Sequence, residues 1–106
     1  MKYRALVSDS AKQDIRTNAR WYNKRKQGLG KQFTGCIKDS IRYIESQPYT
    51  YQTQHLNIRY AYPKTFPYMV LYYVEESKKL VKVIAVVHSS ADPKGYLHGK
   101  YGLGLT

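Results

Sequence analysis

Apolar residues follow a helical spacing in the first half of this chain and a strand-like pattern in the second half. The helical spacing occurs twice, at Ala11, Ile15, Ala19 and Tyr22 and again at Phe33, Ile37, Ile41 and Ile44. Apolar residues that recur every three or four positions lie on one face of a helix, so the pattern predicts two amphipathic helices.

Capping and breaking residues set the limits of these helices. Ser8, Asp9 and Ser10 precede the first stripe and are good N-cap residues. Gly28 is a good helix stop, and Pro48 lies just past the end of the second stripe. Because almost no residues separate the two helices, we expect an antiparallel helical hairpin.

The remaining apolar segments predict strands. Residues 2–7 form a short first strand, residues 54–60 a weak one, and residues 66–74 a strong one. Residues 80–88 are apolar on both faces apart from Lys82, which is typical of a central, covered strand. The predicted fold is therefore α+β, in the order β-α-α-β-β-β, with the helical hairpin packed on a mainly antiparallel four-stranded sheet. The predicted core residues are Trp21, Phe33, Ile37, Ile41, Val70, Val83 and Val87.

The length of 106 residues suits one domain, which we assign to residues 1–98, with a flexible tail at 99–106. No apolar run is long enough to span a bilayer, and the N-terminus lacks the apolar core of a signal peptide. We therefore expect a soluble cytoplasmic protein that does not bind membranes. A single cysteine, Cys36, excludes an internal disulfide.

Positive charge narrows the choice of partners. Eighteen Lys and Arg against seven Asp and Glu give a net charge of +11. Such a chain attracts polyanions, and two kinds fit: a nucleic acid, or an acidic protein that masks the positive face. A solvated surface that happens to be basic is the alternative interpretation.

The sequence lacks the motifs of several common kinds of reactive site. His55, His88 and His98 are far apart and lack the spacing of metal ligands, so we expect no metal and no cofactor. Ser89, Ser90 and Asp92 lie close to His88, but no nucleophile elbow accompanies them, and no glycine-rich phosphate loop occurs.

A dispersed polar set remains: Arg59, Lys64, His88 and Tyr96. Arg59 and His88 lie near the ends of two predicted strands that should flank the strand at 66–74, so we expect them at one edge of the sheet. The segments that carry Lys64 and Tyr96 should leave from the same edge, which would bring all four residues together. Such a set could cleave RNA, with His88 or Tyr96 moving protons while Arg59 and Lys64 hold the phosphate. A lone histidine at a strand end is, however, more often structural.

A series of motifs in fixed order gives the chain a family resemblance. The motifs are residues 8–15 (SDSAKQDI), Trp21-Tyr22, Gly28-Leu29-Gly30 with Phe33, residues 44–48 (IESQP), Arg59, residues 66–74 (FPYMVLYYV), and residues 83–88 (VIAVVH) with Asp92-Pro93. With these motifs, residues 3–96 resemble the RelE/ParE superfamily of type II toxin-antitoxin toxins. The fold that this resemblance implies agrees with the order of elements given above.

The resemblance implies one of two activities. RelE-like toxins cut mRNA in the ribosome, whereas ParE-like toxins inhibit DNA gyrase and are not nucleases; both are held inactive by an antitoxin that wraps the toxin. The motifs here are closer to ParE. The turn after the last strand reads Ser89-Ser90-Ala91, where many members carry a basic residue and RelE-like nucleases a cationic cluster. Tyr96 matches the tyrosine near the C-terminus of the family.

Three interpretations follow from the resemblance. The first is a ParE-like toxin that binds a target such as DNA gyrase through Arg59, Lys64, His88 and Tyr96, and that a small acidic antitoxin neutralises. The second is a ribosome-dependent mRNA endoribonuclease that uses His88, Arg59 and Tyr96 as catalytic residues. The third is a relative that has lost toxicity and binds only its antitoxin.

Overall fold

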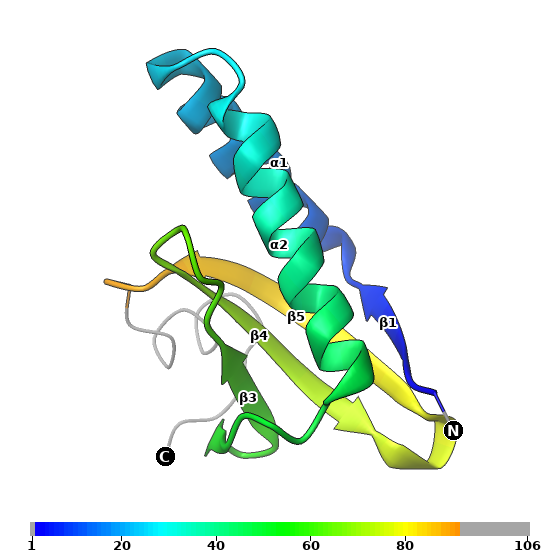
Figure 1. Cartoon of the computed structure of the whole chain (residues 1–106). Helices are drawn as coiled ribbons and strands as arrows, with labels where there is room; N and C mark the ends of the chain where they lie inside the picture. The colour runs from blue at the N-terminus through cyan, green and yellow to red at the C-terminus, as the bar shows by residue number, and fades with distance from the viewer. Residues whose placement is uncertain (1, 92–106) are drawn as a thin grey trace.

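A computed structural model describes residues 2–91, which form two long helices beside a sheet (Figure 1). The elements are β1 (Arg4–Val7), α1 (Asp9–Arg25), α2 (Leu29–Ser46), β2 (Thr53–His55), β3 (Ile58–Ala61), β4 (Tyr68–Glu75), a 3-10 turn (Glu76–Lys78) and β5 (Leu80–His88). The predicted α+β class and helical hairpin are confirmed. The residues proposed as a tail, 99–106, lie outside the described residues.

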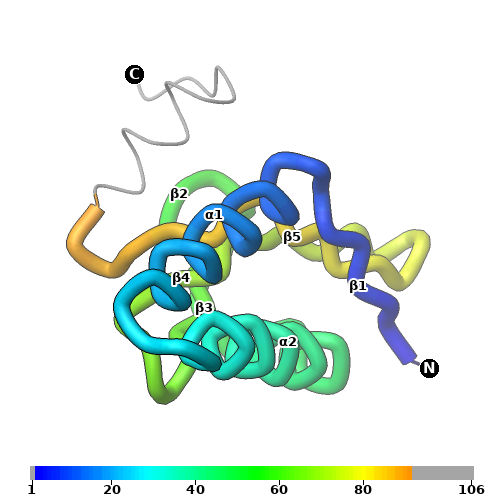
Figure 2. Tube along the Cα trace, turned by 90° about the horizontal axis from the view of Figure 1, so that it is seen from above, coloured from blue at the N-terminus to red at the C-terminus, as the bar shows by residue number. Residues whose placement is uncertain are grey.

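The sheet has the strand order β1-β5-β4-β3-β2. β1 runs parallel to β5, and the other neighbouring pairs are antiparallel. The long, apolar β5 is therefore an interior strand, as its two apolar faces predict. The end-on tube in Figure 2 shows α1 and α2 side by side, with β1 next to β5.

The sheet has five strands, not the predicted four, because residues 54–60 are not one strand. His55 pairs with Ile58, so the chain reverses at Leu56 and Asn57 and separates β2 from β3. Leu56 has a φ of 54°, in the left-handed region that Gly and Asn usually occupy in tight hairpins. Leucine is not a turn signal, so the sequence pattern concealed this hairpin.

Two residues shape the helical hairpin as predicted. The Ser8 hydroxyl accepts a hydrogen bond of 3.0 Å from the Ala11 amide and caps α1. Gly28 has a φ of 86° and lets the chain turn from α1 into α2 within three residues. In residues 2–91, neither helix is long and apolar enough to cross a membrane.

The core has one cluster between the helices and the sheet and a second cluster on the opposite face of the sheet. Phe33, Ile37, Val70 and Val83 are buried in the first cluster, as predicted. Two other predicted core residues are also packed: Val87 is buried in the second cluster, and Ile41 is half-buried against the first.

The prediction that Trp21 belongs to the core is wrong, because 49% of its surface is exposed. Trp21 stands one position before Tyr22 on α1, and Tyr22 takes the inward place on the apolar stripe, against Phe33 and Phe66. The Arg25 guanidinium lies 4.5 Å from the centre of the indole ring. Trp21 is thus a surface residue with a cation against one face.

Two carboxylates fasten the helices to the sheet. Asp14 of α1 accepts a hydrogen bond of 3.0 Å from the Val86 amide, and Glu45 of α2 accepts one of 2.7 Å from the Ala5 amide. Both amides lie on strands, where an unpaired buried N–H is costly. Asp14 and Glu45 therefore act on the inner side of the hairpin, toward the sheet.

A network of polar side chains surrounds Glu76 in the turn between β4 and β5. Glu76 accepts hydrogen bonds from the hydroxyls of Tyr3 and Tyr49 and pairs with Lys79. The bond from Lys79, followed by those from the tyrosines, lowers the pKa of Glu76 from 4.5 to about 2. The same contact with Glu76 raises the pKa of Tyr49 to about 12.

This network predicts a loss of stability in acid. A carboxyl group whose pKa is lower in the folded state stabilises the fold above its unfolded pKa, here 4.5, and the contribution disappears as the pH falls toward 2. We expect Glu76→Gln to melt at a lower temperature than the wild type near neutral pH, with the difference vanishing toward about pH 2. Thermal unfolding across this pH series measures the effect. A difference that stays constant with pH would contradict it.

Candidate functional site

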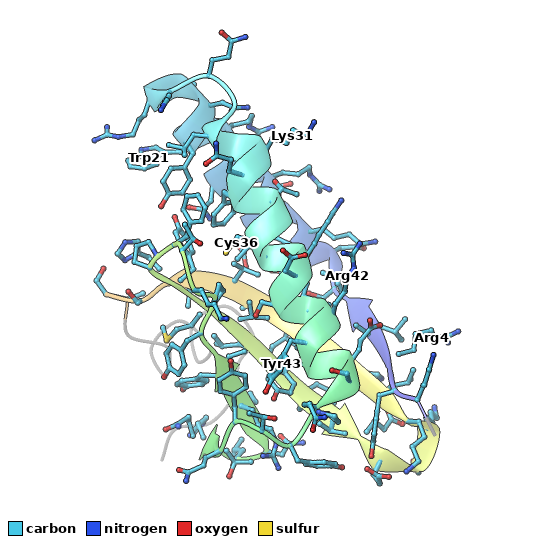
Figure 3. The ribbon with its side chains drawn as sticks, viewed as in Figure 1. Arg4, Trp21, Lys31, Cys36, Arg42 and Tyr43 are labelled. Atoms are coloured by element: carbon cyan, nitrogen blue, oxygen red, sulfur yellow. The ribbon has the colours of Figure 1, made fainter. Side chains whose placement is uncertain are left out.

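His88 is the last residue of β5 and lies in a cleft of about 430 Å³ between α1 and the sheet. The cleft is lined by Thr17, Asn18, Trp21, Tyr22, Tyr68, His88 and Ser90. Figure 3 shows Trp21, one of the lining residues, on α1. The exposed indole and imidazole therefore share one concave surface.

The hydrogen bonds of the His88 ring determine its tautomer. The Ser90 amide lies 3.0 Å from Nδ1, and the Ser90 hydroxyl lies 2.7 Å from the same atom. Because an amide can only donate, Nδ1 is the acceptor and the neutral ring carries its proton on Nε2. In this arrangement the ring can donate a hydrogen bond to a partner, but its basic nitrogen is already occupied.

Tyr68 packs against the His88 ring. The two rings meet edge to face, with 5.2 Å between their centres, and the Tyr68 hydroxyl donates a hydrogen bond of 2.7 Å to Asn18. Burial, and then a contact with Tyr22, raise the pKa of Tyr68 well above its usual value of 10. Tyr68 is therefore a positioning residue that stays protonated, not a proton donor for chemistry near neutral pH.

The structure does not bring Arg59 to His88. Arg59 pairs with Tyr72 on β4, whereas His88 pairs with Tyr68, four residues away. Four strand residues span about 13 Å, and β4 lies between the two strands. The expectation that these residues share one edge is corrected: the turn at Leu56 makes Arg59 the second residue of β3 instead of a residue near the end of a longer strand.

Arg59 has structural partners of its own. Its guanidinium donates to the Tyr51 carbonyl and lies 4.9 Å from the centre of the Tyr49 ring. Beside it, the Tyr72 hydroxyl donates a hydrogen bond of 2.7 Å to the Pro48 carbonyl. Burial raises the pKa of Tyr72 to about 12, although the charge of Arg59 opposes the rise. Together these contacts hold the segment between α2 and β2.

Lys64 lies at the same end of the sheet as His88 but in a different cavity. The Ser89 amide donates to the Pro67 carbonyl at 2.8 Å, which joins the exit of β5 to the loop before β4. Lys64, in that loop, lines a groove of about 850 Å³ between the loop and α2. Figure 3 shows Cys36 and Tyr43 on the α2 side of this groove. Tyr96 lies outside the described residues.

Sequence reasoning missed the α1 side of the His88 cleft. Asn18 and Trp21 contribute to it, and neither was predicted as a site residue. Asn18 carried no recognisable signal. Trp21 could have been found from its position beside the apolar stripe, four residues before Arg25. Within residues 2–91, no cluster of three or more His, Cys, Asp or Glu side chains could hold a metal ion.

Comparison with known protein families shows which family the chain belongs to. The family described as "ParE toxin of type II toxin-antitoxin system, parDE" matches residues 5–93. The chain belongs to the ParE toxin family. A search of curated protein sequences gave no match for this ParE toxin.

Solved structures share the fold of this ParE toxin at low sequence identity. The chromosomal ParDE system from P. aeruginosa is 10% identical with a TM-score of 0.71, covering 83% of this chain and 96% of that one. The isolated E. coli RelE toxin is 16% identical with a TM-score of 0.63, covering 95% and 99%. A chain of the RelBE2 complex from Mycobacterium tuberculosis is 13% identical with a TM-score of 0.61, covering 83% and 99%. The fold is thus common to ParE and RelE toxins, which the predicted superfamily resemblance anticipated.

Proposed function

We propose that this ParE toxin acts by binding a target such as DNA gyrase, and not by cutting RNA. The observation that carries the proposal is the arrangement around His88. Its Nδ1 atom is occupied by two contacts from Ser90, and Arg59 is held elsewhere by Tyr49 and Tyr51. A nuclease needs a free base and a cation at the scissile phosphate, and neither role is filled by these residues.

The His88 cleft suits a contact surface. Trp21 is half exposed, is flanked by Arg25, and lines the cleft together with His88. Tryptophan and arginine are the residues that most often dominate the energy of protein interfaces. We therefore assign the main target contact to Trp21, with His88 donating a hydrogen bond from Nε2 and the basic surface strengthening the contact.

A supercoiling assay with purified protein tests this assignment. We expect the wild type to inhibit gyrase, and Trp21→Ala to weaken inhibition by about 30-fold or more, as for an interface hot spot worth about 2 kcal/mol. His88→Ala, which removes one exposed hydrogen bond, should change inhibition by less than about tenfold. Circular dichroism confirms that both variants are folded. If the wild-type protein has no effect on supercoiling, gyrase is not its target.

We also propose that a small acidic antitoxin neutralises the toxin. The net charge of +11 supports this partner, as do the antitoxin-containing complexes among the structural neighbours. The groove beside Lys64 is large enough for apolar side chains of such a partner, and the exposed rings of Tyr43 and Tyr62 border it. Complementary charge should make association fast and sensitive to salt.

The antitoxin proposal is tested by a pull-down with the product of the adjacent gene. We expect a complex at low salt whose association rate falls as the salt concentration rises. Tyr62→Ala should weaken the complex, whereas Arg4→Gln, at the other end of the sheet, should weaken it much less. No complex at any ionic strength would contradict the proposal.

A ribosome-dependent nuclease is the second candidate function. Two observations favour it: the fold is shared with E. coli RelE, and a histidine ends β5 at the mouth of a cleft. In that case His88→Ala would abolish cleavage, because a general acid or base contributes about 10²–10⁴-fold to the rate.

A further inference from the structure

Four cations form a row along the outer side of α1. Lys12, Arg16, Arg20 and Lys24 follow one another at intervals of four residues, and all are exposed. Four residues of α-helix rise about 6 Å, so this α1 row is about 18 Å long. The buried side of the helix, which carries Ala11, faces the sheet instead.

The carboxylates of the described residues do not neutralise the α1 row. No ion pair within residues 2–91 includes any of its four cations. Asp14 and Glu45 accept hydrogen bonds from strand amides, and Glu75 and Glu76 pair with lysines of β5 and the turn before it. Asp39 lies 3.6 Å from Arg42 on α2. Asp9, in the first turn of α1, is exposed and forms no ion pair with the row. The four cations of the row therefore face solvent without an ion-pair partner among the described residues.

The α1 row acts against the stability of its own helix. Like charges four residues apart repel each other, and the row contains three such pairs in succession. A bound polyanion would relieve this repulsion. The neighbouring helix extends the positive surface through the exposed Lys31 and Lys38, and Figure 3 shows Lys31 and Arg42 on α2.

We propose that the α1 row, together with Lys31 and Lys38, binds the phosphate backbone of duplex DNA. Each DNA strand presents one phosphate per 3.4 Å of its axis, so a row of about 18 Å faces about five phosphates. Lysine and arginine on long side chains need no fixed register to reach them. The contact is electrostatic and independent of base sequence.

An acidic protein fits the α1 row less well than DNA does. Protein interfaces are built around aromatic anchors, whereas phosphate binding needs only charge. The large exposed apolar residues within residues 2–91 are Leu6, Trp21, Tyr43, Tyr49, Leu56 and Tyr62. Along the row, Gln13, Thr17 and Asn23 are exposed and polar. Trp21 is exposed between Arg20 and Lys24 in the sequence, but it lines the His88 cleft.

Fluorescence anisotropy with a labelled duplex of about 25 base pairs tests the proposal. Six phosphate contacts, one for each cation, give a slope of about −5.4 in log K against log salt, which is a loss of about 10³-fold between about 50 and 200 mM. For Arg16→Gln with Arg20→Gln, we expect weaker binding and a slope of about −3.6, or about 100-fold over the same range. Glutamine keeps the helix, since its propensity is close to that of arginine.

The matched control removes the same charge from another surface. Arg4→Gln with Lys78→Gln, at the start of β1 and in the turn after β4, should keep a slope close to the wild-type value. Equal losses in the two double variants, or no binding of DNA by the wild type, would overturn the proposal. Binding of polyglutamate with higher affinity than DNA would overturn it too, in favour of an acidic protein. Gyrase is absent from this experiment, so its outcome is separate from that of the supercoiling assay.

Discussion

Replacing Phe33 with alanine is expected to lower the free energy of unfolding by about 3–5 kcal/mol. Phe33 has no exposed surface and lies at the centre of an aromatic cluster. Its ring centre is 4.8 Å from that of Tyr68 and 5.3 Å from those of Tyr22 and Phe66. Truncation therefore removes burial and ring contacts together and leaves a cavity between α2 and the sheet.

Chemical denaturation measures this change, and Tyr43→Ala is the control on the same helix. Tyr43 is 46% exposed, so its loss should cost much less than that of Phe33. Because Tyr22 and Tyr68 also line the His88 cleft, Phe33→Ala should weaken gyrase inhibition as well. A Phe33→Ala protein as stable as the wild type would mean that the aromatic cluster does not hold the hairpin on the sheet.

Replacing Gly30 with alanine is expected to destabilise the protein by about 1–3 kcal/mol, the usual cost of overpacking. A Cβ atom at this position would lie 2.3 Å from the Ala19 carbonyl oxygen and 2.7 Å from Cγ of Asn23. The first of these neighbours is backbone, so α1 and α2 must move apart. Their separation would also stretch the hydrogen bond of 2.8 Å from the Gly30 amide to Asn23.

Gly35→Ala is the matched control, since it makes the same change on the same helix. A Cβ atom at Gly35 meets nothing within 4 Å, so only the helix preference of alanine should act. We expect Gly35→Ala to stabilise the protein by about 0.5–1 kcal/mol. Thermal unfolding should thus show shifts of opposite sign for the two variants. Shifts of the same sign would contradict the close approach of the helices at Gly30.

The fold could be predicted largely from the sequence because its strongest elements carry their own signals. The Ser8 cap, the turn at Gly28 and the stripe from Phe33 to Ile44 are local features, and the structure confirms each of them. The hairpin between β2 and β3 was missed because its turn depends on Leu56 in a left-handed conformation. The pairing of β2 with β3 closes that turn, although Leu56 is exposed and leucine does not favour the conformation.

The candidate site was less predictable because it depends on register. His88 was correctly placed at the end of β5, but a two-residue turn elsewhere moved Arg59 away from it. Trp21 was assigned to the core because it lies beside the apolar stripe of the first helix, and only the packing of Tyr22 shows that it faces the cleft. The site is assembled from residues of α1, β4 and β5. These residues cannot be identified until the pairing of the strands is known.

Primer extension on ribosome-bound mRNA, in cells that express the wild-type protein or His88→Ala, distinguishes gyrase binding from mRNA cleavage. A toxin that acts by binding gyrase should arrest growth, leave mRNA without codon-specific cuts, and trap gyrase on broken DNA, with His88→Ala close to the wild type. Codon-specific cuts that disappear in His88→Ala would contradict the binding mechanism and identify the protein as a nuclease.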